Sequence, residues 1–241
     1  MFQLNLTEID GRRRTIGSDE ALKWNEGAWE FADLIVGESY DAGKERDGWL
    51  EAGYDDSDWK PVVLRDYGYE ELELQSIEPV RVLRTITPKV CRTPNGELLI
   101  DAGENIVGYV SFELQLEAGQ EVKLEYTETV DKEGNFLRNI IGQNKQQTDI
   151  IVVQVGSVQV ETVVQLHGFQ YVRITGTDDT NPEHYRIDVI GTPLETTGEF
   201  TCSDPRLNQL QENILRSQIG NMICIPTDCP QRERTGWTGD M

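Results

Sequence analysis

Residues 109–128 read Tyr-Val-Ser-Phe-Glu-Leu-Gln-Leu-Glu-Ala-Gly-Gln-Glu-Val-Lys-Leu-Glu-Tyr-Thr-Glu. Apolar and polar residues alternate on both sides of Ala118-Gly119, so each half has one apolar face and one polar face. This period of two is the pattern of a half-buried β-strand, and a glycine-containing pair between two such runs is typical of a turn. The stretch therefore predicts two antiparallel strands joined by a short connection.

The same alternation recurs elsewhere in the chain. Residues 98–101 and 171–176 predict further half-buried strands, and residues 149–155 form a nearly continuous apolar run, as in the interior of a sandwich. Turn signals such as Asp10-Gly11 and Asn95-Gly96 separate the strands. Because no helical pattern lies between them, the fold class predicted for this part is mainly β, an antiparallel β-sandwich.

The first 70 residues differ in composition and pattern from the rest of the chain. They carry three tryptophans before position 50, and residues 54–59 have the composition of a turn that closes on Trp59. The pattern changes between residues 71 and 78, which places a domain boundary there. One continuous β-domain is the alternative.

The pattern changes to helical after residue 202. Ser203-Asp204 offers an N-cap, and Pro205 suits the first turn of a helix. Apolar residues then recur at steps of three and four, which predicts an amphipathic helix of about five turns. The residues on this stripe are Leu207, Leu210, Ile214, Leu215, Ile219 and Met222. Because one amphipathic helix must bury its stripe against other structure, we expect a helical domain to begin here.

The chain is strongly acidic, with 43 acidic and 22 basic residues and a net charge of −21. Such a surface repels nucleic-acid phosphates and anionic lipids, so we expect neither nucleic acid nor a membrane as a partner. Uncharged partners, sugars among them, meet no such repulsion. The simplest interpretation of the acidity is solubility.

Targeting and metal signals are sparse. No apolar run approaches the roughly 18 residues of a membrane span, and the first residues lack a signal-peptide pattern. The localisation stays open between the cytoplasm and, if a signal precedes this sequence, the periplasm or the exterior. Four cysteines and two histidines supply a zinc site poorly, so we expect no metal and no cofactor.

Charged residues are concentrated in residues 228–240, Asp-Cys-Pro-Gln-Arg-Glu-Arg-Thr-Gly-Trp-Thr-Gly-Asp. Cleavage of a glycosidic bond requires a carboxylic acid that protonates the leaving oxygen, and Glu233 is a candidate. Asp228 and Asp240 could gather around the same ligand in a curled loop. Trp237, between two glycines, could offer an apolar platform to a sugar ring. The alternative is a solvated loop with balanced charges.

This 13-residue stretch resembles, without a gap, the signature of bacterial α-L-rhamnosidases, glycoside hydrolase family 78. Residues 38–49 and 53–59 resemble the N-terminal β-domain of that family, and residues 101–108, 125–128 and 167–173 resemble its concanavalin-like sandwich. The resemblance implies β-sandwich domains of the concanavalin-like or jelly-roll type, followed by the first helix of an (α/α)6 barrel. The domains expected are residues 1–74, an incomplete N-terminal β-domain, residues 75–195, the sandwich, and residues 196–241, the start of the catalytic domain.

The resemblance also implies a function. Family members are inverting hydrolases that release terminal α-L-rhamnose from glycosides or polysaccharides. By position, Glu233 would be the general acid, Asp228 and Asp240 would bind rhamnose hydroxyls, Arg232 would add a polar contact and Trp237 an apolar wall. The negative charge of the two aspartates would offset the neighbouring arginines and keep Glu233 protonated.

The general base of that family would lie outside these residues. We therefore expect the chain alone to be inactive, residues 223–241 to be loosely held, and a homodimer to be the candidate assembly. A carbohydrate-binding sandwich without chemistry, using Trp49 or Trp59, is an alternative, as is a purely structural or oligomerisation domain. Glu104, Asn105, Asp131 and Asn135 could form a calcium site, but polar turn chemistry explains them more simply.

Overall fold

The structure is a computed structural model that describes residues 3–65, 75–140, 146–154, 156–160 and 165–239. The chain contains two compact units. One unit comprises Met1–Gly27 and Glu45–Gln75, and the other comprises Ala28–Lys44 and Ser76–Met241. The domain boundaries drawn from the sequence stay predictions.

The first unit is built from short antiparallel pairs. Strand β1 (Gln3–Thr7) pairs with β2 (Arg13–Gly17) around the predicted turn at Asp10-Gly11, and β3 (Lys23–Trp24) pairs with β6 (Lys60–Pro61). The predicted turn at 54–59 is present, because the Trp59 N–H donates to the carbonyl of Asp56 at 3.0 Å. The rings of Trp49 and Trp59 lie 6.5 Å apart, and Trp49 remains 48% exposed.

The second unit contains a ten-stranded sheet with the order β4-β5-β11-β10-β13-β9-β14-β7, in which β8 and β12 also pair with β9. All these pairs are antiparallel except β11 with β5, which is parallel. The predicted mainly-β class is confirmed. The strands are β4 Trp29–Asp33, β5 Gly37–Asp41, β7 Arg81–Ile86, β8 Lys89–Arg92, β9 Leu98–Leu116, β10 Glu121–Thr127, β11 Thr148–Val152, β12 Gly156–Val160, β13 His167–Thr175 and β14 Tyr185–Gly191.

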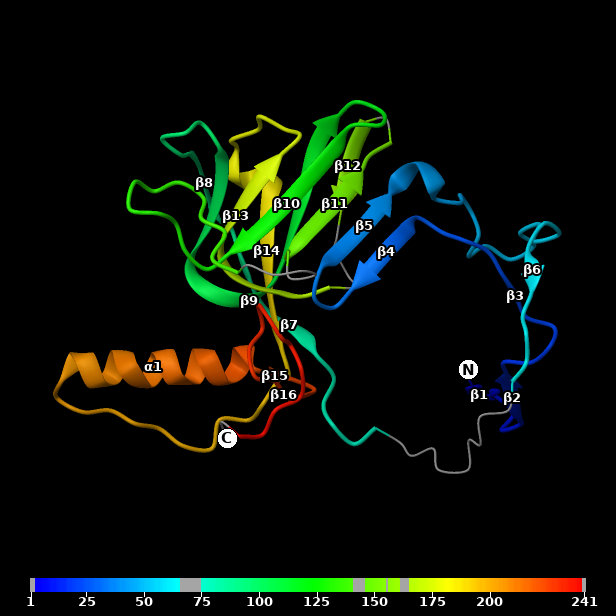
Figure 1. Ribbon diagram of the computed structural model, residues 1–241. Helices are drawn as coiled ribbons and strands as arrows, with labels where there is room; N and C mark the ends of the chain where they lie inside the picture. Colours follow the sequence, from blue (N-terminus) through cyan, green and yellow to red (C-terminus); the bar gives the residue numbers. More distant parts are fainter. Residues whose placement is uncertain (1–2, 66–74, 141–145, 155, 161–164, 240–241) are drawn as a thin grey trace. The chain divides into compact units, whose positions relative to one another are not determined.

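Strand β9 organises the sandwich. The segments predicted as two strands, 98–101 and 109–116, belong to this one strand of 19 residues. Its beginning pairs with β8 and β13, and its later part pairs with β14 and β12. Figure 1 shows that the strands of this unit curl. They enclose a core of fully buried side chains. These include Ile100, Val110, Val122, Leu124, Ile151, Phe169, Val172 and Ile187. Of the predicted strand at 149–155, residue 155 lies outside the described residues.

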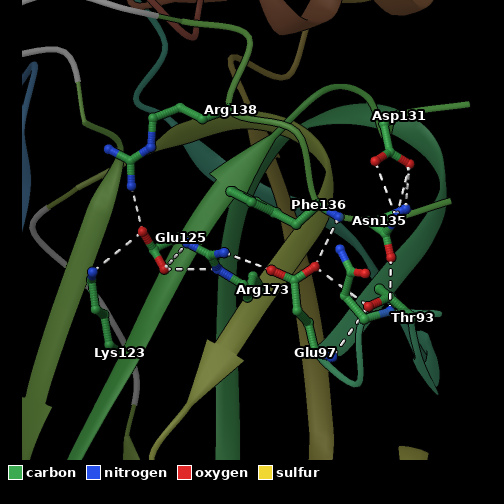
Figure 2. Close-up of polar contacts among 10 residues, drawn as sticks. Thr93, Glu97, Lys123, Glu125, Asp131, Asn135, Phe136, Arg138 and Arg173 are labelled. Atoms are coloured by element: carbon green, nitrogen blue, oxygen red, sulfur yellow. Dashed lines mark hydrogen bonds and ion pairs between the residues drawn. The ribbon is translucent and has the colours of Figure 1, made fainter. Parts of the chain in front are cut away.

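One surface of the sandwich carries a charged network around Arg173 of β13 (Figure 2). Its guanidinium binds Glu97 at 2.7 Å and Glu125 at 2.8 Å, and Glu125 also contacts Lys123 and Arg138. Glu97 accepts a hydrogen bond from the backbone N–H of Phe136 at 3.1 Å. The network thus connects β10 and β13 to the 131–138 loop.

The turn inside that loop is closed by polar side chains. Asp131 Oδ1 accepts hydrogen bonds from the backbone N–H groups of Glu133 and Asn135, at 3.0 and 2.7 Å. These bonds lower the pKa of Asp131 below its ordinary value, the bond from Asn135 having the largest effect. The Asp131 carboxylate therefore stabilises the turn, as polar turn chemistry predicts.

Helix α1 (Pro205–Gly220) confirms the helical prediction. Asp204 is the N-cap and accepts a hydrogen bond from the Arg206 N–H at 2.9 Å. Met222, which the pattern placed on the helix, begins the short strand β15 (Met222–Ile223) instead, and that strand pairs with β16 (Ile225–Pro226). The helix stops at Gly220, whose backbone lies so close to Val107 that an added Cβ would be 3.0 Å from its side chain.

Most of the apolar stripe of α1 is exposed. The structure describes every residue of the helix, and none of them is buried. Leu210 and Ile214 on the stripe are exposed. No helix in the described part of the chain is long and apolar enough to cross a membrane.

Candidate active site

The residues that follow α1 form a tight loop rather than an extended tail. The Trp237 N–H donates to the Pro226 carbonyl at 2.9 Å, and the Asp228 N–H donates to the Thr235 carbonyl at 3.1 Å. The Asp228 side chain closes the loop further by accepting from the Thr235 N–H at 3.1 Å. We call residues 228–237 the carboxylate loop.

The carboxylate loop brings three potential ligand groups together. A carboxylate oxygen of Asp228, the thiol of Cys229 and a carboxylate oxygen of Glu233 all lie within 4.8 Å of one another. The Cys229 thiol donates to Glu233 Oε2 at 3.1 Å, and the Glu233 N–H donates to the Cys229 sulfur at 3.3 Å. The Cys229 side chain therefore holds both the backbone and the carboxylate of Glu233.

Arg232 completes the surroundings of Glu233. Its Nε donates to Glu233 Oε2 at 2.6 Å, and this hydrogen bond raises the pKa of Arg232 above its ordinary value. The sequence predicts that Asp228, Glu233 and Asp240 gather together, and the structure brings Asp228 and Glu233 close to each other. Trp237 is exposed at the end of the loop, whereas Asp240 lies outside the described residues.

The three clustered groups also have the donor chemistry of a small cation site. Each already has a hydrogen-bond partner within the loop, because Asp228 accepts from Thr235, and Glu233 accepts from Cys229 and Arg232. The carboxylates of Asp228 and Glu233 are thus already hydrogen-bonded within the loop.

Arg234 is buried in the sandwich, whereas Arg232 is exposed. Its guanidinium donates to the carbonyls of Leu34 and Leu166, and to Gln147 Oε1 at 2.9 Å. The expectation that this segment is loosely held is therefore wrong for the carboxylate loop. The sequence pattern could not show that Arg234 is buried.

A buried chain of polar groups continues from Arg234. Its Nη2 lies 3.3 Å from Nδ1 of His167, and Nε2 of His167 lies 2.9 Å from Asp149. Because arginine can only donate, Nδ1 must accept, and the single proton of a neutral imidazole then sits on Nε2 and is donated to Asp149. The ring of Tyr126 stacks on this imidazole, with 3.9 Å between centroids.

Burial shapes the protonation of this chain. Burial lowers the pKa of His167 below its ordinary value, against the attraction of Asp149, so the imidazole is neutral at pH 7. Burial also lowers the pKa of Arg234 to about 10, which leaves the guanidinium charged at pH 7. A positive Arg234 and a negative Asp149 are thus connected through a neutral histidine.

The backbone at this junction is strained. Arg234 and Gln147, which are hydrogen-bonded to each other, have φ values of 54° and 44°. Side-chain-bearing residues adopt this left-handed region at a cost of order 1 kcal/mol or more, which the surrounding contacts must offset. At Gly168 the loop lies against β13 so closely that an added Cβ would be 2.8 Å from Pro230.

Sequence reasoning missed the groups that fix the loop: Gln147, Asp149, His167, Cys229 and Arg234. One signal was present, since His167 is one of only two histidines and adjoins apolar strand residues. Its partners lie 18 and 67 residues away in sequence, and no local pattern announces such contacts.

Three family models match consecutive parts of the chain. They describe an alpha-L-rhamnosidase N-terminal domain at residues 1–84, a bacterial alpha-L-rhamnosidase concanavalin-like domain at residues 91–191, and a bacterial alpha-L-rhamnosidase 6 hairpin glycosidase domain at residues 195–241. The chain belongs to the bacterial α-L-rhamnosidase family. The carboxylate loop lies in the part of the chain that matches the 6 hairpin glycosidase domain.

Individual relatives agree with the family models. An alpha-L-rhamnosidase of Streptomyces avermitilis is 34% identical over 100% of this chain and 24% of the relative. The structure of an alpha-L-rhamnosidase from Dictyoglumus thermophilum superposes with a TM-score of 0.91 at 32% identity, covering 99% of this chain and 27% of the other. A Streptomyces avermitilis alpha-L-rhamnosidase complexed with L-rhamnose superposes with a TM-score of 0.89 at 34% identity, covering 99% and 24%. The chain thus spans about a quarter of the length of these relatives.

Proposed function

We propose that the parent protein is an inverting α-L-rhamnosidase that releases terminal rhamnose from glycosides or polysaccharides, and that this chain supplies its general acid, Glu233. The observation that carries the proposal is the convergence of Glu233 and Asp228 on a loop anchored in the sandwich. The complex of a similar protein with L-rhamnose supports the choice of sugar.

The surroundings of Glu233 suit a general acid that loses its proton and must regain it in each catalytic cycle. Arg232 stabilises the carboxylate that remains after the proton has been given to the leaving oxygen. The nearby negative charge of Asp228 favours renewed protonation. Asp228 and Asp240 are assigned to rhamnose hydroxyls, and Trp237 to the apolar face of the sugar.

Asp228 is too close to Glu233 to be the base of an inverting mechanism. Inversion needs a water molecule between acid and base, which places the two carboxyl groups roughly 6.5–9.5 Å apart. Oxygens of Asp228 and Glu233 lie within 4.8 Å. We therefore propose that the base comes from a part of the parent protein other than these 241 residues, and that the chain alone does not hydrolyse rhamnosides.

The proposal is tested in a protein of the relatives' length that carries this chain. We expect Glu233→Gln to lower kcat for a rhamnosyl disaccharide by about 10²–10⁴-fold. The loss should be much smaller for an activated nitrophenyl rhamnoside, because a good leaving group needs little protonation. Glu212→Gln, on the exposed face of α1, is the matched control and should leave both rates unchanged.

Each part of the proposal has its own contrary result. Equal losses for both leaving groups would rule out the acid role, and unchanged turnover would rule out Glu233 altogether. Proton NMR of the first product should show the anomer opposite to the substrate, and the same anomer would exclude inversion. Turnover by the 241-residue chain that Glu233→Gln abolishes would disprove the external base.

A further inference from the structure

A cavity of about 420 Å³ lies beside the carboxylate loop. Its walls come from β9 on one side, the C-terminal half of α1 on another, and the loop itself. The polar side chains in its lining include Asn105, Glu128, Asn213, Arg216, Asp228 and Gln231. Ile106, Val107 and Pro230 add an apolar part.

Part of this polar lining is already ordered. Glu128 accepts a hydrogen bond from Asn105 at 2.9 Å through one oxygen and from Gln231 at 3.1 Å through the other. Arg216 is paired with Glu104 at 2.9 Å, so its charge is balanced outside the lining. A strand of the sandwich, a helix and the carboxylate loop thus present fixed polar groups to one space.

This lining matches the chemistry of an uncharged sugar. Side-chain amides such as those of Asn105 and Asn213 both donate and accept hydrogen bonds, as hydroxyl groups require. The carboxylates of Glu128 and Asp228 accept from hydroxyls but repel an anionic ligand. Ile106 and Val107 can face the C–H groups of a sugar ring.

The cavity adjoins the acid without containing it. Asp228 lines the cavity and also lies within 4.8 Å of Glu233, whereas Glu233 is not among the described residues of the lining. A ligand in the cavity would therefore contact Asp228, the direct neighbour of the Glu233 carboxyl that gives the proton.

We propose that this cavity binds the leaving group: an uncharged sugar residue to which the rhamnose is attached. The proposal rests on the proposed function and makes Asn105 and Asn213 specificity-determining residues. The sandwich then helps to select the substrate, because Asn105 belongs to β9.

The kinetic test uses the full-length protein and two substrates, a rhamnosyl-glucose disaccharide and nitrophenyl rhamnoside. We expect Asn105→Ala and Asn213→Ala each to lower kcat/KM for the disaccharide about 5-fold, the loss of one neutral hydrogen bond. The nitrophenyl substrate should be unaffected, since its ring makes no such bonds. Gln218→Ala, on the same helix but outside the lining, is the control for both rates.

A binding test uses the 241-residue chain and does not depend on turnover. We expect rhamnosyl-glucose to shift the side-chain amide NMR signals of Asn105 and Gln231, identified by substitution, and rhamnose alone to shift them less. A rhamnosyl-uronate should shift them less than the neutral disaccharide because Glu128 and Asp228 repel its charge.

The outcomes separate the two proposals. A full-length protein inactive on both substrates would overturn the proposed function and the leaving-group site with it. Activity with equal losses on both substrates would place rhamnose itself in the cavity and overturn only the leaving-group site. Unchanged kinetics in both variants, or amide signals that no disaccharide shifts, would likewise overturn only that site.

Discussion

Arg234 and Arg173 are each the centre of a charged network, but their environments are opposite. Arg234 is 4% exposed and binds two backbone carbonyls, Gln147 and a neutral histidine. The Arg173 side chain is 28% exposed and binds two carboxylates directly. Burial lowers the pKa of both, but in Arg173 the hydrogen bonds to Glu97 and Glu125 outweigh it, so its pKa is raised.

The difference shows what each network does. Around Arg173, Glu125 has three basic neighbours, so the loss of one leaves others. Around Arg234, the buried Asp149 is connected to the guanidinium through His167. We conclude that the Arg173 network contributes modestly to the stability of the sheet. The Arg234 network instead anchors the carboxylate loop to the sandwich.

The largest effect is expected for Arg234→Met. The change leaves Asp149 buried without its guanidinium, which costs about 3–5 kcal/mol in the free energy of unfolding. Hydrogen exchange of the β9 and β13 amides measures this within the sandwich. Arg232→Met, its exposed neighbour, is the control and should change stability by less than about 0.5 kcal/mol. Equal effects of the two changes would contradict the buried anchor.

A smaller effect is expected from pH. The folded state holds His167 neutral with a lowered pKa, whereas the unfolded state takes up a proton below about pH 6.5. The unfolded state then binds more protons, so this stability is present above pH 6.5 and is lost as pH falls. The stability should therefore fall as pH drops below about 6.5, with a slope of at most about 1.4 kcal/mol per pH unit for this one proton.

Substitution of His167 tests whether this residue causes the pH dependence of stability. In His167→Gln the slope between pH 6.5 and 5 should disappear, while His184→Gln, at an exposed ion pair, should keep it. The Glu125 pKa is lowered, since its basic partners outweigh the effect of burial. Its contribution is therefore lost only below about pH 4.5, outside this range. A slope that survives in His167→Gln would exclude the buried histidine as its source.

The smallest effect is expected for Arg173→Met. Lys123 and Arg138 still neutralise Glu125, so we expect a loss of about 1 kcal/mol that shrinks in high salt. The same exchange measurement at two salt concentrations checks this. A loss as large as that of Arg234→Met would remove the distinction between the two networks.

Much of the fold is predictable from local pattern. The strands within 109–128 and the helix capped by Asp204 appear where the periods of two and 3.6 place them. The carboxylates of the site were also found, because Asp228 and Glu233 lie close in sequence. The long strand β9 was seen as two pieces, since its middle, residues 102–108, breaks the alternation.

The sequence by itself determined the β class, the C-terminal helix, the resemblance to rhamnosidases and the candidate acid. Tertiary structure alone decided that Arg232 faces Glu233 while Arg234 enters the sandwich. The physical reason is distance along the chain. Periodicity reports neighbours within a few residues, whereas Arg234 meets Gln147 across 87 positions, and only the packed sheet brings the two together.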